Sequence, residues 1–276
     1  MASIANSTRE QSPQPDGLTA ADIQDGLRSK WLGRMAHCFQ SVESTQDAAR
    51  QLALGGQPEG DIVVAEEQVA GRGRMGREFF SPRGGIWCSI ILRPKLRPER
   101  ISLLSLAAGL AAAEGVSQAS GLQPVLKWPN DLLINERKVC GILIEMAAGQ
   151  EVVHHLIVGL GINVNLPAAA FPPHLSSLAT SLLIETGHPV SRKLLLQRLL
   201  ERLERRYEEL STGRSRELLE DWKAWPNTLG RNVRIQTAAD QWEGRAEDLD
   251  RDGSLLVRLA DGSARRAIAG DVHLLG

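Results

Sequence analysis

Residues 71–77 read Gly-Arg-Gly-Arg-Met-Gly-Arg, and their types and spacing could do chemistry. Closely spaced glycines let backbone N–H groups approach an anion. The three guanidinium groups can bind phosphate or carboxylate oxygens through paired hydrogen bonds. The segment therefore predicts anion binding. A basic surface loop or an RNA-contacting patch has the same composition, so the identity of the anion stays open at this point.

Two common nucleotide-binding motifs are excluded for this loop. No Gly-Lys-Ser/Thr follows it, so it is not a P-loop. Residues 78–82 read Glu-Phe-Phe-Ser-Pro, and a crossover helix does not continue through that proline. The loop is therefore not a dinucleotide fingerprint either.

A second group of polar side chains occupies residues 127–131, Lys-Trp-Pro-Asn-Asp. Pro129 stiffens the chain and holds these side chains in fixed relation. Lys138 follows seven residues after Asp131. Cations for phosphate groups and a carboxylate for a metal suit Mg²⁺-assisted nucleotidyl transfer. A simple packed turn is the alternative for the pentapeptide alone.

The elements that must position these residues can be read from apolar periodicity. Ser44 or Thr45 caps a helix that stops at Gly55-Gly56. Residues 61–66 form a buried strand that leads toward the glycine-arginine loop, and residues 86–92 form another. Residues 102–120 are rich in alanine and leucine and predict a closely packed helix.

The second polar group is expected on a hairpin. Residues 125–128 and 139–146 read as strands. Between them, Leu132-Leu133-Ile134 leads into a polar turn at Asn135-Glu136-Arg137, which predicts a hairpin. Residues 155–164 form a further strand, and Ser191 caps a long amphipathic helix.

The pattern changes after Pro226, where short alternating strands are separated by Asp252-Gly253 and Asp261-Gly262 turns. We predict a disordered tail at residues 1–17, a mixed α/β catalytic domain at 18–227 and a small all-β domain at 228–276.

The composition narrows the class of protein. The 276 residues are 42% hydrophobic, enough for a sizeable core, and 32 basic side chains balance 33 acidic ones. A net charge of −1 argues against bulk attraction to nucleic acid or to an anionic membrane. The three cysteines have neither zinc-ligand nor redox spacing, and the polar N-terminus lacks a signal core. We expect a cytoplasmic protein.

Five segments together resemble the biotin protein ligase family. They are Ser44-Thr45-Gln46-Asp47; Gln68 with residues 71–77; residues 127–131; Arg137-Lys138 with residues 141–145; and residues 159–165. Their order and approximate spacing match the family. The resemblance implies a class II synthetase-like mixed α/β catalytic domain with a C-terminal SH3-like β-barrel. It also implies a ligase that uses ATP and Mg²⁺ to convert biotin to biotinyl-5′-AMP, then biotinylates a biotin carboxyl carrier protein of acetyl-CoA carboxylase.

Residue roles follow from the same resemblance. The implied biotin-binding residues are Ser44, Thr45, Gln46, Gln68, Arg72, Gly73, Arg74, Lys138 and Gly141. The implied ATP or adenylate residues are Arg74, Arg77, Phe79, Trp128, Asn130 and Asn163. Arg72, Lys138 and Asp131 are the expected catalytic residues, with Asp131 as the metal ligand. For Ser44 and Thr45 plain helix capping is the alternative, and for Lys138 a solvated hairpin position.

Three other functions fit these residues less well. A lipoate or octanoyl ligase shares the fold, but the arginine loop and residues 127–131 favour biotin. For a ligase-repressor, about 40 residues before the first motif leave too little chain for a helix-turn-helix domain. An RNA-binding module is disfavoured by neutral charge and 4% aromatic residues.

One departure from the family concerns the C-terminal domain. Several relatives carry an arginine near the chain end, whereas residues 272–276 here read Val-His-Leu-Leu-Gly. A nucleotide or metal contact from that domain is therefore in doubt. The sequence leaves open whether the chain acts as a monomer or a homodimer.

Overall fold

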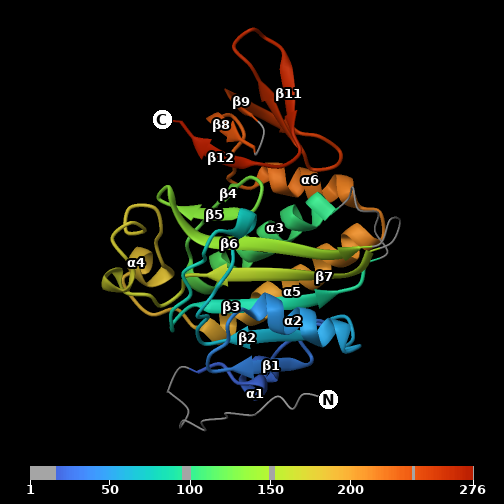
Figure 1. Ribbon diagram of the computed structural model, residues 1–276, viewed down its shortest axis with the longest axis vertical. Coiled ribbons are helices and arrows are strands. Elements are labelled where there is room, and N and C mark those ends of the chain that lie inside the picture. Colours follow the sequence, from blue (N-terminus) through green and yellow to red (C-terminus); the bar gives the residue numbers. More distant parts are fainter. Residues whose placement is uncertain (1–16, 95–100, 149–152, 238–239, 276) are drawn as a thin grey trace.

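A seven-stranded mixed sheet occupies the larger part of the molecule (Figure 1). The computed structural model describes residues 17–94, 101–148, 153–237 and 240–275. The strands are β1 (Ala36–Phe39), β2 (Ile62–Ala65), β3 (Ile86–Leu92), β4 (Val125–Lys127), β5 (Asp131–Ile134), β6 (Arg137–Ala148) and β7 (Val153–Ile162). Their order across the sheet is β1-β2-β3-β7-β6-β5-β4. β1 and β2 are parallel, and the other neighbours are antiparallel.

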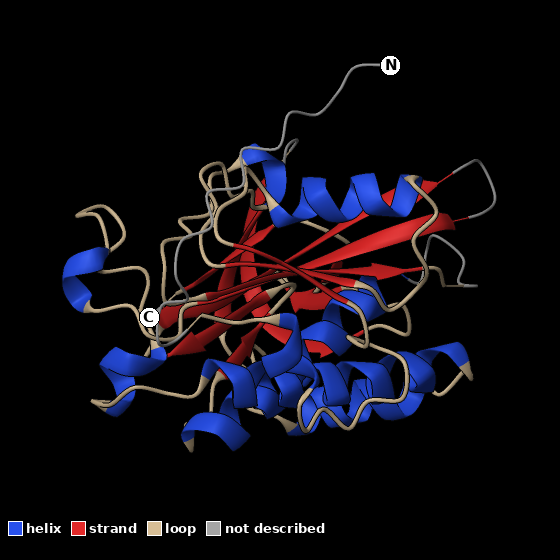
Figure 2. Ribbon diagram, turned by 90° about the horizontal axis from the view of Figure 1, so that it is seen from below, coloured by secondary structure: helices blue, strands red, loops and turns tan. Residues whose placement is uncertain are grey.

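Helices cover both faces of this sheet because both faces are apolar. Alternate residues of a strand point to opposite faces. In β2, Ile62 and Val64 join the main core, whereas Val63 joins a second cluster with Ala49 and Ala53. The second cluster lies between the sheet and α2 (Thr45–Leu54). The opposite face is covered by α3 (Ile101–Ser120) and α5 (Arg192–Ser211) (Figure 2).

The long elements follow the periodicity of the sequence. α2 begins after Ser44 and ends at Gly55, and α5 begins after Ser191, whose hydroxyl accepts from the Leu194 N–H. The turn between β5 and β6 places Asn135 and Glu136 at φ values of 48° and 63°. Two successive left-handed residues are typical of a tight hairpin. The predicted hairpin is confirmed.

α3 is a core helix. Its length and apolar composition would allow it to cross a membrane, but most of the helix is buried inside the molecule. It packs against the sheet on one side and against α5 on another. Three further helices, α1 (Ala20–Gln24), α4 (Leu182–Thr186) and α6 (Ser215–Ala224), were not predicted from the sequence.

A separate five-stranded antiparallel sheet closes the chain. It contains β8 (Asn232–Gln236), β9 (Gln241–Leu249), β10 (Leu255–Arg258), β11 (Ala264–Ala267) and β12 (Asp271–Leu274), in the order β11-β10-β9-β8-β12. Its β9–β10 turn contacts the larger part, where Trp128 Nε1 donates to the Gly253 carbonyl at 2.9 Å. The predicted tail lies almost wholly outside the described residues, and the boundary at 227/228 stays a prediction.

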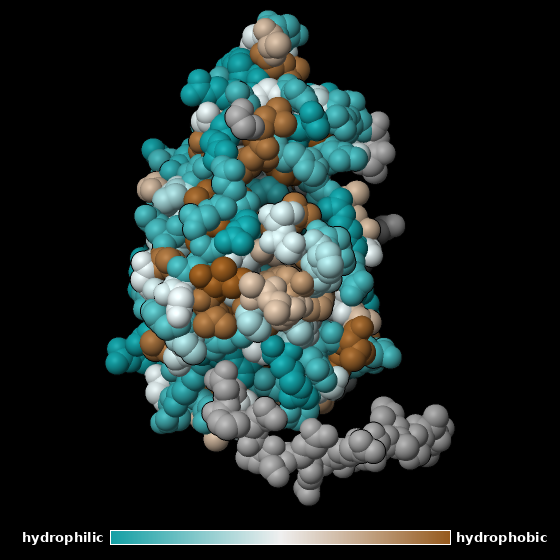
Figure 3. All heavy atoms as spheres, turned by 90° about the vertical axis from the view of Figure 1, so that its left-hand side faces the viewer, coloured by the Kyte–Doolittle hydropathy of each residue, from teal (hydrophilic) through white to brown (hydrophobic). Residues whose placement is uncertain are grey.

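The surface on the side that carries α4 is mostly hydrophilic, with an apolar area near its middle (Figure 3).

Candidate functional site

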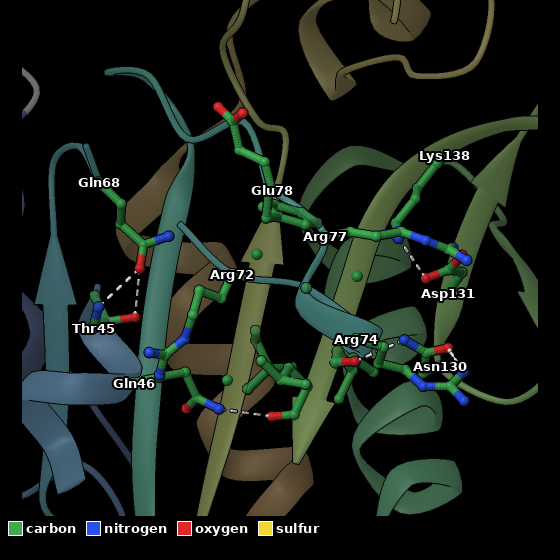
Figure 4. A pocket seen from close by; sticks show the side chains of 18 of the residues that line it. Thr45, Gln46, Gln68, Arg72, Arg74, Arg77, Glu78, Asn130, Asp131 and Lys138 are labelled. Carbon is green, nitrogen blue, oxygen red and sulfur yellow. Dashed lines mark hydrogen bonds and ion pairs between the residues drawn. The ribbon is translucent and has the colours of Figure 1, made fainter. Parts of the chain in front are cut away.

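A pocket lies where the glycine-arginine loop crosses the sheet (Figure 4). The loop contributes the short helix η1 (Arg74–Gly76), in which Met75 adopts a left-handed conformation. The predicted site residues that line the pocket are Thr45, Gln46, Gln68, Arg72, Gly73, Arg74, Arg77, Phe79, Asn130, Asp131, Lys138 and Gly141. Residues separated by up to 96 positions therefore converge on one cavity.

One end of the pocket is lined by uncharged polar groups. The Thr45 N–H and Oγ1 both donate to Gln68 Oε1, at 2.8 and 2.9 Å. Gln68 Nε2 donates to Ser81 Oγ at 2.8 Å, and Ser89 Oγ donates to Thr45 Oγ1. These bonds fix the start of α2 against β3 and hold amide and hydroxyl groups in defined directions.

Gln46 contributes a buried polar atom to this end. Its Nε2 donates to the Leu143 carbonyl at 3.3 Å, but its Oε1 has no hydrogen-bond partner among the described residues. Gln46 is only 3% exposed, and an unpaired buried acceptor is costly. It lies directly over Gly159, where a Cβ atom would be 2.9 Å from the Gln46 side chain. This acceptor therefore suits a ligand N–H donor.

Phe79 forms part of the wall between the two ends. A Cβ atom on Gly161 would lie 2.4 Å from its ring, and one on Gly141 would lie 2.7 Å from it. The ring also packs edge-on against Trp87, with centroids 6.0 Å apart. The two glycines thus allow an aromatic side chain to lie directly against the sheet.

Arg72 is held by carboxylates from two elements. Its two terminal nitrogens pair with both oxygens of Asp47 on α2, each at 2.9 Å. Glu145 on β6 lies 3.4 Å away on the other side. Figure 4 shows the side chain pointing toward Gln46. This geometry places a cation beside the uncharged end of the pocket.

The other two arginines join the loop to the C-terminal sheet. Arg74 Nη1 donates to Asn130 Oδ1 at 2.9 Å and to the Gly270 carbonyl at 3.2 Å. Burial lowers the pKa of Arg74, while the carboxylates of Asp271 and Asp131 oppose that shift. Arg77 forms an ion pair with Asp271. The C-terminal sheet therefore helps to close this end of the pocket.

Two lysines share the Asp131 carboxylate. Lys138 Nζ lies 2.6 Å from Asp131 Oδ1, and Lys127 Nζ lies 3.7 Å from Oδ2. Burial lowers the pKa of Lys127, an effect that Asp131 partly offsets. Lys138 Nζ is also 5.5 Å from the Phe79 ring centroid, within cation–π range. The charged end thus combines a carboxylate with several cations.

Three predicted site residues do not line this pocket. Ser44 is buried, and its hydroxyl has no partner among the described residues. Asn163 is buried and donates to the Thr180 carbonyl at 2.9 Å. Trp128 lines an adjoining pocket that includes Arg74 and Asn130.

Sequence reasoning missed Glu78 and Asp271, which both line the pocket. Glu78 follows the loop directly and could have been included on position alone. Asp271 lies 194 residues from Arg77, its partner, and no local signal links them.

Family models match both parts of the chain. Residues 38–163 match the biotin/lipoate A/B protein ligase family, and residues 228–275 match the biotin protein ligase C-terminal domain. The biotin–[acetyl-CoA-carboxylase] ligase of Mycobacterium tuberculosis is 33% identical over 269 residues, covering 95% of this chain and 97% of that protein. The chain belongs to the biotin protein ligase family.

Other members of the biotin protein ligase family support this placement. The bifunctional ligase/repressor BirA of Bacillus spizizenii is 37% identical over 262 residues, 95% of this chain and 80% of that protein. The structure of Aquifex aeolicus biotin protein ligase in complex with biotin and ATP aligns with a TM-score of 0.77 and 29% identity, covering 88% of this chain and 99% of that one. The expected family, enzyme class and mixed α/β fold are confirmed. The individual residue roles stay predictions.

Proposed function

We propose that this protein activates biotin with ATP to biotinyl-5′-AMP and transfers the biotinyl group to a lysine of a biotin carboxyl carrier protein. The observation that carries the proposal is the division of one pocket into two chemically different ends. The uncharged end offers the unpaired Gln46 Oε1 beside the Thr45–Gln68 network. The charged end offers Arg72, Arg74 and Lys138. A ligand with a neutral amide-like head and an anionic tail fits that division.

In the first step the biotin carboxylate attacks the α-phosphorus of ATP, and pyrophosphate leaves. Two anions must meet, so the site has to neutralise the charge that builds in the transition state. Arg72 lies nearest the uncharged end, and we assign it to the carboxylate. Lys138 is assigned to the transferring phosphoryl group, and Arg74 and Arg77 to the remaining nucleotide charge.

In the second step a carrier lysine amine attacks the mixed anhydride, and AMP leaves. The loop must then keep water from the intermediate while admitting the amine. Its arginines contact α2, β6, Asn130 and the C-terminal sheet. That arrangement supports a covering role. We assign no covalent nucleophile to the enzyme.

A Mg²⁺ ion would be held by Asp131. The described residues contain no group of three or more His, Cys, Asp and Glu side chains able to hold a metal. Mg²⁺ commonly uses one or two carboxylates together with substrate phosphates and water, and a single Asp131 carboxylate fits that role. Bound there with a nucleotide, the ion would offset phosphate charge.

The cellular context is also part of the proposal. The carrier of acetyl-CoA carboxylase is the proposed protein partner, and the cytoplasm the proposed compartment. The three cysteines are free, which fits a reducing compartment. We include no nucleic-acid partner, because the net charge of −1 provides no bulk attraction. Sedimentation with and without biotin and ATP would decide between monomer and homodimer.

The direct test is incubation with biotin, Mg-ATP and an isolated carrier domain, followed by intact-mass measurement. A gain of one biotinyl group on the carrier supports the proposal. Thermal shifts with biotin and with lipoate form the second arm. Stabilisation by lipoate alone, with no gain in carrier mass, contradicts it.

A further inference from the structure

Glu185 on α4 lies outside the pocket, and its carboxylate side chain is only 5% exposed. Its Oε1 accepts from Arg137 Nη2 at 2.6 Å and from Thr180 Oγ1 at 2.5 Å, and its Oε2 accepts from Asn135 Nδ2 at 2.6 Å. Charge-assisted hydrogen bonds are about twice as strong as neutral ones. Glu185 therefore ties the β5–β6 turn to the segment that leads into α4.

All three contacts surround Lys138. Arg137 precedes it in the chain, and Asn135 belongs to the left-handed turn that begins its strand. On its other side, the Lys138 N–H donates to the Leu178 carbonyl at 2.8 Å, and the Thr180 N–H donates to the Lys138 carbonyl at 2.9 Å. Glu185 thus fixes both the hairpin and the neighbouring segment that brackets the Lys138 backbone.

The Lys138 side chain depends on this support. A lysine ammonium lies at the end of a flexible four-carbon chain, so its position follows its backbone and its partners. Here the Lys138 ammonium lies 2.6 Å from Asp131. The turn that precedes its strand contains two residues in the left-handed conformation, Asn135 and Glu136. Such conformations cost energy and persist only where surrounding contacts hold them.

We propose that Glu185 is a positioning residue for Lys138: through Arg137, Asn135 and Thr180 it holds the lysine ammonium at the charged end of the pocket. Its effect on catalysis rests on the proposed function, because it acts on the step assigned to Lys138. Small displacements of a catalytic group can slow a reaction by roughly 100-fold. We expect Glu185→Ala to slow adenylate formation by about 10-fold or more. The rate for Glu185→Gln should fall between the rates of the parent and of Glu185→Ala.

The first experiment needs no activity. Parent, Glu185→Ala and Glu185→Gln proteins are acetylated briefly, and labelling of each lysine is measured by peptide mass spectrometry. A lysine held in an ion pair reacts slowly, so labelling of Lys138 should rise about 5-fold in Glu185→Ala. Lys193, which pairs with Asp25 and has a similar 36% exposure, is the internal control. Unchanged Lys138 labelling would overturn the proposal.

The matched control variant is Glu114→Ala. Glu114 is also a poorly exposed acid, and it pairs with Arg202 and Arg206 on α5, away from the lining of the pocket. It should lose stability without changing Lys138 labelling. An equal rise in Lys138 labelling in Glu114→Ala would show general loosening and would also overturn the proposal.

The second experiment measures single-turnover biotinyl-AMP formation in a double-mutant cycle. If Glu185 acts only through Lys138, Glu185→Ala should slow the parent about 10-fold and the Lys138→Ala variant less than about 2-fold. If the fold-losses in rate from the two substitutions multiply in the double variant, Glu185 acts independently of Lys138 and the proposal is contradicted. If the parent itself forms no adenylate, the proposed function fails, and the labelling experiment still decides whether Glu185 positions Lys138.

Discussion

Buried glutamine side chains in this molecule differ in how fully they are paired. Gln197 Nε2 donates to the Asp22, Ile23 and Asp25 carbonyls, and it joins α1 to α5. Gln46, by contrast, leaves Oε1 without a partner among the described residues. A fully paired group contributes to the fold, whereas an unpaired one costs stability unless a ligand satisfies it. The contrast supports our proposal that Gln46 binds the ligand, whereas Gln197 holds α1 against α5.

Gln46→Met should therefore weaken biotin binding while leaving the ligand-free protein about as stable as the parent. Losing one hydrogen bond to a ligand corresponds to about 5- to 150-fold in affinity, from roughly 1–3 kcal/mol. Calorimetry with biotin and thermal unfolding measure the two effects. Gln197→Met is the matched control, which should lower stability and leave biotin affinity unchanged. The opposite result would remove Gln46 from the site.

Arg72→Gly should loosen retention of the adenylate. The change removes a guanidinium group held by Asp47 and Glu145 and leaves a more flexible loop. We expect faster release of biotinyl-AMP, followed by labelling of lysines on bystander proteins. Release is followed by rapid filtration and labelling by streptavidin blot. Arg83→Gly, which removes an exposed contact with Glu67, is the control. Retention equal to the parent would mean that Arg72 does not close the pocket.

Much of the pocket could be predicted because its residues occur in short motifs. Arg72, Asp131 and Lys138 line one cavity as the motifs indicate. Asn163 belongs to a matching motif, but its side-chain amide donates to the Thr180 carbonyl and does not line the pocket. That hydrogen bond depends on the path of the segment around Thr180, which the sequence around Asn163 does not predict.

At the scale of elements, β6 and β7 can form the floor of the pocket because they carry glycines on one face. Gly141 and Gly161 face each other in register and leave room for Phe79, while Leu160 points into the core on the opposite face. Period-two alternation predicts which residues share a face. It does not predict that an aromatic ring from a loop fills the gap, because that contact depends on the loop's path.

Gly161→Ala should displace Phe79. The added carbon would lie 2.4 Å from the ring, and overpacking of this kind costs ~1–3 kcal/mol. We expect about a 10-fold loss of adenylate formation, because Phe79 lies beside Lys138. Gly109→Ala is the control, since its added carbon would meet Leu126 at 3.5 Å and Ile142 at 3.8 Å, which are ordinary van der Waals contacts. The double variant Gly161→Ala/Phe79→Leu should recover stability; if it does not, the ring contact is not the cause.

The two longest helices could be predicted, whereas α4 could not. α3 and α5 span 20 residues each; α5 repeats its apolar positions several times, and α3 is a long run rich in alanine and leucine. α4 has five residues, too few for a helical period to show. Yet α4 carries Glu185, which ties the segments around Lys138. The supporting contacts of a site can thus lie on elements that pattern reading does not find.

At the scale of the whole molecule, the two sheets meet at the charged end of the pocket. Residues 272–276 lack the arginine that several relatives carry, so the sequence put a contact between the C-terminal domain and the site in doubt. The structure places Asp271 and the Gly270 carbonyl there instead, against Arg77 and Arg74. Fold class could be predicted from sequence because each sheet has its own pattern. The contact between them depends on long-range packing.

Asp271→Ala should weaken nucleotide handling without weakening biotin binding. It removes the partner of Arg77 but leaves the Thr45–Gln68 network intact. Arg77 is 61% exposed, so solvent screens the pair, and we expect only about a 3- to 10-fold rise in KM for ATP. Glu243→Gln, which breaks an exposed ion pair with Arg234 in the same sheet, is the control. An equal change in biotin affinity would show that Asp271 supports the whole pocket.

The burial of α3 has a consequence for synthesis of the chain. α3 is complete at Ser120, but α5, which covers it, begins only at Arg192. At roughly 5–20 residues per second, the ribosome needs about 4 to 14 seconds to add that interval. During this time an apolar helix, long enough to cross a membrane, lacks its cover. Chaperone demand and aggregation during rapid expression should therefore be set by α3 and by the pace of translation between it and α5.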